Sequence, residues 1–253
     1  MMISETFLRL QDIVVEFGGF RAVNGLNLEL KKGELRCLIG PNGAGKTTAL
    51  DVMCGKVKPK AGRMTLKDRD ITDLPDYKMA RAGVGRKFQV PSFFRELSVR
   101  DNLEVAYCKR LGVFANVLRF RRSAEGDGLE KIAELVGLED FLDHLAGYLS
   151  HGQTQSLEIA LLLAQDSDLI LMDEPTAGMT SAETMHTAKI LNALRGRHTL
   201  LVVEHDMAFV REISDVITVM HQGKVLAEGR AMEIQSNQAV KDAYLGSGGI
   251  SHA

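Results

Sequence analysis

The feature that most constrains this sequence is a glycine-rich run of eight residues, GPNGAGKT, at positions 40–47. It matches the pattern G-x-x-x-x-G-K-[ST] and lies between the apolar run Leu35–Ile39 and a helical stretch expected over Lys46–Met53. Glycines let such a loop curl so that successive backbone N–H groups point at one anion, and the helix N-terminus adds partial positive charge. The run therefore predicts a phosphate-binding loop in an α/β fold. The residues expected to bind the nucleotide there are Gly40, Pro41, Asn42, Gly43, Ala44, Gly45, Lys46, Thr47 and Thr48.

Two side chains of this loop carry specific chemistry. The Lys46 ammonium group is expected to contact the β- and γ-phosphates, and the Thr47 hydroxyl group is expected to ligate Mg²⁺. A second motif supports this interpretation, because the apolar run Leu169–Met172 ends in Asp173 and Glu174. Beside a phosphate loop, Asp173 would hold the magnesium shell and Glu174 would activate the attacking water. Taken alone, the second motif is also compatible with a buried strand that ends in a charged loop.

Composition excludes several other classes of protein. With 253 residues, the chain is long enough to bury a hydrophobic core without disulfide or metal cross-links. The formal net charge of −2 argues against nucleic-acid binding through bulk positive charge. Cys37, Cys54 and Cys108 are too few and too scattered for a disulfide framework or a zinc site, which favours a reducing cytosol. The sequence shows neither a secretory signal nor an apolar run of membrane-spanning length.

The remaining pattern alternates between strands and helices. Most of the stretch Ser98–Gly152 is expected to be helical, with breaks around Ala124–Gly128. The expected strands share period-two alternation or a short apolar run. They are Phe7–Phe17, a strand through Leu26 and Leu30, Arg63–Asp70, Leu169–Met172, Thr199–Val203, and a hairpin of Val216–Met220 with Lys224–Glu228.

Several further motifs follow in a fixed order, and here the sequence resembles the ATP-binding subunits of ABC transporters. That family carries a signature LSGGQ upstream of the Asp-Glu strand, where this chain has LSHGQ at positions 149–153. Gln89 matches the glutamine of the family's Q-loop, and His205 matches its switch histidine. The segment Ala177–Thr180 stands at the position of the D-loop, and Phe17 at the position of the aromatic residue that stacks on adenine.

The resemblance implies roles for these residues. Glu174, His205 and Gln89 would be catalytic, and Gln89 would also reach the magnesium ion. Phe17 would contact adenine, although Phe20 is a nearby competitor. The signature residues expected to contact the nucleotide are Ser150, Gly152 and Gln153. In the family, they contact ATP held by the opposite subunit, so the resemblance implies a head-to-tail dimer with two ATP molecules in its interface.

The resemblance also implies the architecture. We expect one ABC ATPase domain over residues 1–253, an α/β fold with a P-loop NTPase (RecA-like) core, an antiparallel β subdomain and an α-helical subdomain. The expected parts are the β subdomain at 5–70, with the P-loop segment (about 35–55) inserted in the core, the helical subdomain at 92–155, and the core sheet with the C-terminal part at 156–246.

The sequence departs from the family pattern at two positions. The third signature residue is His151 instead of glycine, and Gly178-Met179-Thr180 replaces the Leu-Asp pair of the D-loop. The segments FQVPSFF at 88–94 and AYLG at 243–246 resemble the branched-chain amino acid importers. Within that group, the LSHGQ signature and the loop Ala177–Thr180 resemble the ATPase subunits of the urea and short-chain amide branch.

The expected partners follow from the same resemblance: transmembrane permease subunits, a sister ATPase subunit or a second copy of this chain, and, indirectly, a periplasmic solute-binding protein. The expected location is peripheral, on the cytoplasmic face of the inner membrane, with ATP and Mg²⁺ as cofactors. The basic stretch Lys109–Arg122 is compatible with a solvated amphipathic helix or with a surface near anionic headgroups.

Two other functions remain compatible with parts of the sequence. A soluble ABC ATPase that remodels its target would share all of these motifs, but such proteins usually carry two cassettes or a long coiled-coil insertion. A stand-alone P-loop kinase would share only the phosphate loop and would leave the signature and His205 unexplained.

Overall fold

The computed structural model describes residues 5–87, 93–110 and 126–245, with only the backbone at a few positions beside the gaps. Two sheets organise these residues. The six-stranded sheet has the order β10-β9-β3-β8-β7-β6, in which β10 alone is antiparallel to its neighbour. The antiparallel sheet has the order β2-β1-β4-β5. The strands are β1 Thr6–Phe17, β2 Phe20–Lys31, β3 Leu35–Ile39, β4 Ala61–Leu66, β5 Arg69–Asp70, β6 Val84–Arg86, β7 Leu169–Asp173, β8 Thr199–Val203, β9 Val216–His221 and β10 Lys224–Gly229.

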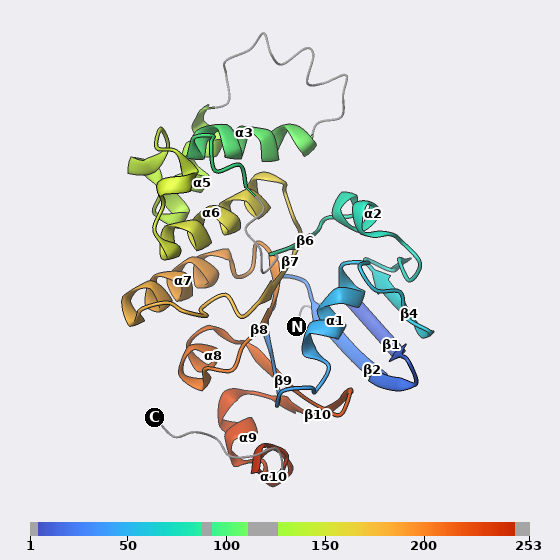
Figure 1. Ribbon diagram of the computed structural model, residues 1–253. Helices are drawn as coiled ribbons and strands as arrows, with labels where there is room; N and C mark the ends of the chain where they lie inside the picture. Colours follow the sequence, from blue (N-terminus) through green and yellow to red (C-terminus); the bar gives the residue numbers. More distant parts are fainter. Residues whose placement is uncertain (1–4, 88–92, 111–125, 246–253) are drawn as a thin grey trace.

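The helices lie mainly on one side of the six-stranded sheet, and the antiparallel sheet with α1 lies on the other (Figure 1). The α-helices are α1 Lys46–Met53, α2 Asp76–Arg81, α3 Val99–Arg110, α5 Gly126–Val136, α6 His151–Ala164, α7 Ser181–Leu194, α8 Met207–Ile213, α9 Ala231–Ser236 and α10 Gln238–Leu245. Two short 3₁₀ turns, Glu139–Phe141 and Ala146–Tyr148, connect α5 to α6.

Side-chain alternation along the central strands builds two hydrophobic cores. On β7, Ile170 and Met172 face the helices, whereas Leu169 and Leu171 face the antiparallel sheet. All five residues of β7 and of β8 are buried, as expected for parallel strands covered on both faces. The same arrangement holds for β3, so the short apolar runs of the sequence became central strands.

The sheet explains where the site lies. Parallel strands β3, β7 and β8 point in one direction, so the segments after Ile39, Asp173 and Val203 emerge at the same edge. This edge is where ligands bind in open parallel sheets. The phosphate loop, the Asp-Glu pair and the histidine segment therefore meet there, although the sequence separates them widely.

Several sequence predictions are confirmed, and one is wrong. Strand Leu35–Ile39 and helix Lys46–Met53 have the predicted bounds, and the hairpin of β9 and β10 is present. The single strand predicted at Arg63–Asp70 is instead a hairpin of β4 and β5. Lys67 and Asp68 form its turn with φ of +49° and +60°, a left-handed conformation that ends the first strand.

Candidate functional site

The phosphate loop turns between β3 and α1 through two glycines that no other residue could replace without strain. Gly40 has φ +149°, and a Cβ atom there would lie 2.2 Å from the carbonyl oxygen of Met220. Gly45 has φ +99° and caps α1, and a Cβ atom there would lie 2.4 Å from the carbonyl oxygen of Ala22. The sheet and the β1–β2 hairpin thus hold the loop from both sides.

Lys46 folds back over its own loop. Its Nζ atom donates hydrogen bonds to the carbonyl oxygens of Gly40 at 2.7 Å and Pro41 at 3.1 Å. Burial lowers the pKa of Lys46, while the carboxylates of Glu174 and Asp173 oppose that shift. The ammonium group is therefore placed inside the loop, held by weak carbonyl partners that phosphate oxygens would replace with stronger, charge-assisted bonds.

Asp173 ends β7 as a buried carboxylate with an unsatisfied oxygen atom. Its side chain is 4% exposed, and Oδ2 accepts no hydrogen bond from any residue in the described ranges. The neighbouring Thr47 hydroxyl group favours the ionised form of this carboxylate, and Nη2 of Arg86 lies 3.8 Å from Oδ2. Burial raises the pKa of Asp173. A free carboxylate oxygen beside a threonine hydroxyl is a donor set that suits Mg²⁺.

Glu174 and His205 come together at the same edge. Oε1 of Glu174 lies 3.6 Å from Nδ1 of His205, and both side chains are substantially exposed, at 47% and 67%. Glu174 has φ +46°, an uncommon value for a non-glycine residue, and its N–H donates to the carbonyl oxygen of Val203 at 2.9 Å. Strained backbone of this kind is typical of functional positions.

A buried glutamate that sequence reasoning missed supports this pair. Glu204 is 1% exposed, and its Oε1 accepts hydrogen bonds from Thr176 N at 3.1 Å and Thr176 Oγ1 at 2.7 Å. Its Oε2 accepts from His205 N at 3.2 Å. Glu204 therefore ties the loop after Glu174 to the segment that carries His205. The available signal was the position of Glu204 directly after the apolar run Leu200–Val203, at the start of the polar sequence Glu204-His205-Asp206.

Arg86 and Lys87, at the end of β6, were also missed. Nη1 of Arg86 contacts Oδ1 of Asp51 on α1 and lies 3.2 Å from Sγ of Cys54. Nζ of Lys87 lies 3.5 Å from Oε2 of Glu158 on α6, and both side chains are 7% exposed. These two contacts connect the strand before the predicted Q-loop to the phosphate-loop helix and to the signature helix.

Ser150 begins the signature helix, α6. Ser150 Oγ accepts a hydrogen bond from Gln153 N, and Gln153 Oε1 accepts one from Ser150 N at 2.8 Å, which makes a capping box. Gly152 donates its N–H to Glu183 on α7. Within the described chain, no hydrogen bond or ion pair joins these residues to Lys46 or to the rest of the phosphate loop.

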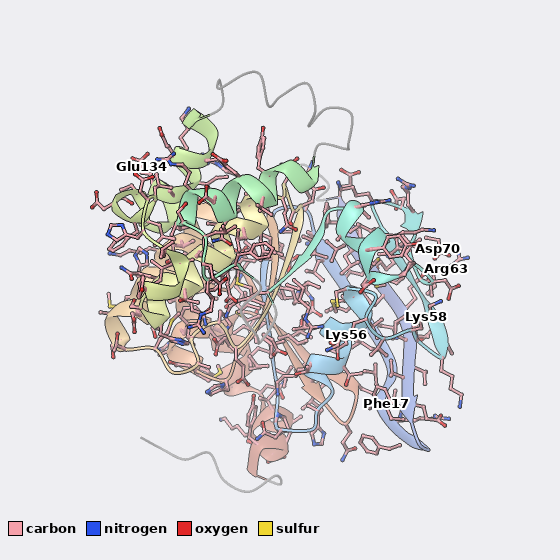
Figure 2. All side chains as sticks on the ribbon, turned by 45° about the horizontal axis from the view of Figure 1, so that its top comes forward. Phe17, Lys56, Lys58, Arg63, Asp70 and Glu134 are labelled. Atoms are coloured by element: carbon pink, nitrogen blue, oxygen red, sulfur yellow. The ribbon has the colours of Figure 1, made fainter. Side chains whose placement is uncertain are left out.

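Both aromatic residues proposed for adenine are accessible. Phe17 and Phe20 are partners at the tip of the β1–β2 hairpin and are 52% and 66% exposed. Figure 2 shows Phe17 at the end of this hairpin. Gln89 lies outside the described residues, as does nearly all of the basic stretch Lys109–Arg122.

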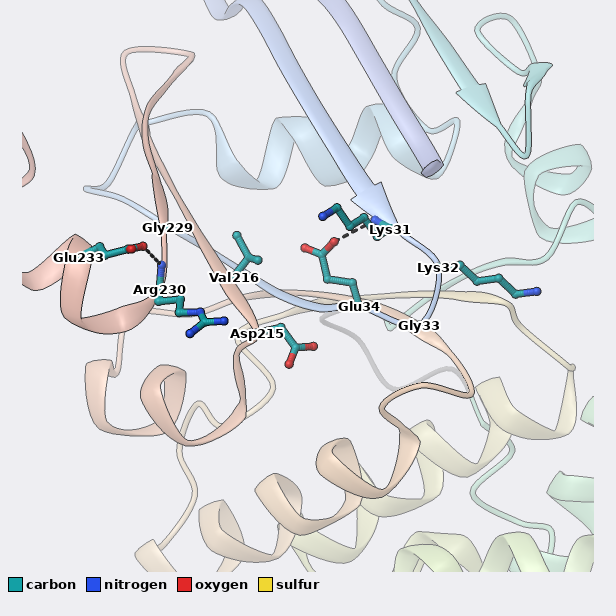
Figure 3. A pocket seen from close by; sticks show the side chains of 9 residues that line it. All are labelled: Lys31, Lys32, Gly33, Glu34, Asp215, Val216, Gly229, Arg230 and Glu233. Atoms are coloured by element: carbon teal, nitrogen blue, oxygen red, sulfur yellow. Dashed lines mark hydrogen bonds between the residues drawn. The ribbon is translucent and has the colours of Figure 1, made fainter. Parts of the chain in front are cut away.

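A surface pocket of about 430 Å³ lies elsewhere and contains none of the predicted site residues. Glu34 precedes β3 and Asp215 precedes β9, so this pocket is at the sheet edge opposite the phosphate loop (Figure 3). Its charged groups are partly engaged, because Glu34 accepts from Lys31 N at 2.8 Å and Glu233 accepts from Arg230 N at 2.7 Å. In the described ranges, no helix is long and apolar enough to cross a membrane.

A phosphate loop, a buried aspartate followed by a glutamate, a histidine beside that glutamate and a helix capped by a signature serine define an ATP-binding cassette. Comparison with known proteins agrees, and the chain belongs to the ABC transporter family. Residues 23–177 match the family described as ABC transporter. Residues 224–250 match the family described as branched-chain amino acid ATP-binding cassette transporter.

The chain is similar over nearly its whole length to branched-chain amino acid transport ATP-binding proteins. It is 40% identical to LivG of Salmonella typhimurium, over 96% of this chain and 99% of the relative. It is 39% identical to BraF of Pseudomonas aeruginosa, with the same coverage. A crystal structure of an ABC transporter cassette in its ADP conformation is 30% identical, covers 96% of this chain and 99% of its own, and superposes with a TM-score of 0.82.

These relationships show an ATP-binding subunit of the branched-chain amino acid importer type, with ATPase activity. They also confirm the predicted P-loop ABC fold. Another solved cassette, described as a dimer in a post-hydrolysis state with ADP and phosphate, is 26% identical over 88% of this chain and 98% of its own, with a TM-score of 0.71.

Proposed function

We propose that this chain binds ATP at the Gly40–Thr48 loop and hydrolyses it with Glu174 as the group that activates water, and so powers an importer. The observation that carries the proposal is the pairing of Glu174 and His205, with 3.6 Å between Oε1 and Nδ1, beside the buried Asp173 carboxylate. An accessible carboxylate next to a histidine, at the edge where the phosphate loop emerges, supports this assignment, because a general base must reach the attacking water.

Each residue of the site has a chemical task in this proposal. Lys46 exchanges its carbonyl partners for the β- and γ-phosphate oxygens. Glu174 accepts a proton from the attacking water, and His205 donates a hydrogen bond to the γ-phosphate. Phe17 stacks on adenine from the hairpin tip. Gln89 links the site to the helical part of the chain.

Asp173 and Thr47 fit a magnesium ion, which would neutralise phosphate charge when bound. The fit rests on the unsatisfied Oδ2 atom and on the neighbouring hydroxyl group. Until a cation arrives, burial disfavours the ionised form of Asp173. The same burial strengthens the electrostatic attraction between the Asp173 carboxylate and a bound cation.

The signature residues act on a second subunit in this proposal. Ser150 is exposed and Gln153 is half-buried at the start of α6, and within the described chain neither forms a hydrogen bond with the phosphate loop. Two subunits arranged head to tail would place each Ser150 against ATP bound to the other. The second subunit is a sister ATPase or another copy of this chain.

We further propose that the cargo is urea or a short-chain amide. The support is the sequence LSHGQ at 149–153 together with Ala177-Gly178-Met179-Thr180, which resemble that branch. The curated relatives carry names of branched-chain amino acid transport, so leucine is the alternative cargo. Cargo would bind to other subunits, namely transmembrane permeases and a periplasmic binding protein. This chain would bind the permeases peripherally at the cytoplasmic face of the membrane.

The test uses the chain co-purified with its permease partners in nanodiscs, with the binding protein added. The ATPase rate is measured with urea, acetamide and leucine. Stimulation by urea or acetamide supports the proposed cargo, and stimulation by leucine alone replaces it with branched-chain amino acids. Failure to recover a membrane partner would contradict transport and favour a soluble remodelling ATPase.

A further inference from the structure

Helix α1 carries two polar side chains, one turn apart, that lie near the ends of the central strands. Thr47 and Asp51 are four residues apart, so they lie on the same face of the helix. Thr47 neighbours Asp173, the carboxylate proposed for magnesium. The side chain of Asp51, which is 16% exposed, instead contacts the guanidinium group of Arg86. The phosphate-loop helix therefore touches both Asp173 and the arginine closest to it.

The strand register places Arg86 on the same face of the sheet as Asp173. Arg86 of β6 is paired with Leu171 of β7, and Leu171 packs in the core on the side of α1 and the antiparallel sheet. Asp173 is two residues further along β7, so its side chain points to that side as well. Nη2 of Arg86 lies 3.8 Å from Oδ2 of Asp173, and the two side chains are only 6% and 4% exposed.

The two side chains approach each other but form no hydrogen bond. Among the described residues, Oδ2 of Asp173 accepts no hydrogen bond, and Nε of Arg86 donates none. A buried donor and a buried acceptor without partners cost free energy. A bidentate contact through Nε and Nη2 would give both atoms a partner. Because the side chains remain apart, another contact must hold the guanidinium group in its position.

That contact is made by α1. Nη1 of Arg86 donates a hydrogen bond to Oδ1 of Asp51 and lies 3.2 Å from Sγ of Cys54, the C-terminal cap residue of α1. Lys56 also lies near Asp51, with 3.5 Å between Nζ and Oδ1, but its side chain is 60% exposed and this pair contributes little. Arg86 is therefore anchored to the phosphate-loop helix through Nη1, mainly by the charge of Asp51.

We propose that Asp51 is a positioning residue for magnesium: it restrains Arg86 and so keeps Oδ2 of Asp173 available to the cation. Mg²⁺ binds carboxylate oxygens in a shell of nearly fixed geometry, so an arginine bonded to the same oxygen would compete with it. Asp51 does not contact the cation in this proposal and acts only through Arg86. The inference rests on the proposed function, because it concerns the magnesium ion that accompanies ATP.

The test measures how much Mg²⁺ is needed to strengthen nucleotide binding. A fluorescent, non-hydrolysable ATP analogue is titrated into the purified full-length chain at a series of Mg²⁺ concentrations and in EDTA. Asp51→Asn keeps the shape of the side chain but removes the charge that holds Arg86. We expect this variant to need about tenfold more Mg²⁺, because the cation must displace one charge-assisted bond. The Kd measured in EDTA should not change, whereas a general loss of local structure would weaken binding under both conditions and would overturn the inference.

A double-mutant cycle shows whether Asp51 acts through Arg86. Arg86→Met removes the group that would compete for Asp173, so we expect no increase in the Mg²⁺ requirement. In this background, Asp51→Asn should have no further effect. An equal effect of Asp51→Asn in both backgrounds would overturn the inference. So would weaker Mg²⁺ binding in Arg86→Met alone, which decides the question even if Asp51→Asn does not fold.

Two further variants serve as controls. Lys56→Met removes the other cation next to Asp51. Asp70→Asn makes the same chemical change in an exposed pair, in which Nε of Arg63 lies 3.0 Å from Oδ2 of Asp70 (Figure 2). Both variants should keep the wild-type Mg²⁺ requirement. An increase in either control as large as that in Asp51→Asn would overturn the inference, because a change of surface charge would then explain it.

The wild-type chain separates failure of the inference from failure of the proposed function. If Mg²⁺ strengthens binding of the analogue equally in wild type and Asp51→Asn, the inference is overturned and the proposed function stands. If Mg²⁺ does not strengthen binding in the wild-type chain, the proposed magnesium site is overturned, and the inference with it.

Discussion

Oε1 of Glu174 lies 3.6 Å from Nδ1 of His205, although the two residues follow different strands of the central sheet. Glu174 N is bonded to the carbonyl oxygen of Val203, and Glu204 joins Thr176 to the backbone of His205. The pair is therefore held by backbone and buried side-chain contacts, and its geometry does not depend on flexible exposed side chains alone.

This relationship predicts that His205 and Glu174 act as a unit. His205→Ala should lower kcat by about tenfold or more and leave the Kd for ATP nearly unchanged, because Lys46 and the loop amides are expected to supply most of the phosphate contacts. Combined with Glu174→Gln, it should cause little further loss. Steady-state kinetics and nucleotide titration provide the measurement, and independent, multiplicative losses would show that the two side chains do not cooperate.

Lys46→Ala should weaken ATP binding. Losing charge-assisted bonds to phosphate costs about 1.5–3 kcal/mol, which raises the Kd by about ten- to a hundredfold. Lys58→Ala is the control, because this exposed lysine follows the same helix but lies outside the loop (Figure 2). Titration with a fluorescent ATP analogue measures both variants. An unchanged Kd for Lys46→Ala would remove the lysine from the site.

Asp173→Asn should stabilise the nucleotide-free chain while it abolishes the contribution of Mg²⁺ to ATP binding. The ionised carboxylate is buried with an unsatisfied oxygen, so its removal should raise Tm by about 2–4 °C for each kcal/mol gained. Calorimetry without nucleotide, and ATP titrations with and without Mg²⁺, make the measurement. A lower Tm for the variant would show that the buried charge is already well compensated.

The same residue predicts a pH dependence. The pKa of Asp173 is raised in the folded chain, so the folded state binds a proton more tightly than the unfolded state. Without nucleotide, stability from this group should therefore decrease as the pH rises from the ordinary value of 3.8 to the raised pKa, and then stay constant. The difference in Tm between Asp173→Asn and wild type should widen over that window. A constant difference would contradict the account.

The buried pair of Lys87 and Glu158 predicts an asymmetry between single and double variants. Burial lowers the pKa of Lys87 and raises that of Glu158, so each charge depends on the other. Lys87→Met alone should destabilise the fold by about 3–5 kcal/mol, whereas adding Glu158→Leu should recover most of this loss. Guanidinium chloride unfolding measures the stability, and equal stability of the single and double variants would argue against the pair.

The parts of the fold that the sequence predicted best are those with a local cause. The apolar run Leu35–Ile39, the glycines of the loop and the helix from Lys46 are specified by residues within one short segment. The predicted bounds of this strand and this helix were therefore correct. Strand β6 was not predicted because Val84-Gly85-Arg86 is too short to show a periodic pattern. The turn at Lys67 and Asp68 was not predicted because a left-handed backbone at two consecutive charged residues has no strong sequence signature.

The residues of the site also separate into those with a local sequence signal and those without one. Motif spacing identified Lys46, Asp173 and Glu174, because each follows a recognisable strand, whereas His205 was identified only through the resemblance to the family. Glu204 and Glu183 were not predicted because their partners, Thr176 and Gly152, are distant in sequence and become neighbours only in the folded chain. The resemblance supplied the signature residues, but only the structure showed that Gly152 N is bonded to Glu183 within its own chain.

The central claim is that this chain hydrolyses ATP with Glu174 as the group that activates water. Single-turnover hydrolysis by wild type and Glu174→Gln, at saturating ATP and Mg²⁺, tests it most directly. We predict that the variant binds ATP as tightly as wild type, hydrolyses it about 10²–10⁴-fold more slowly, and accumulates as an ATP-bound dimer. Near-normal hydrolysis by Glu174→Gln would contradict the claim and move the catalytic role to another residue.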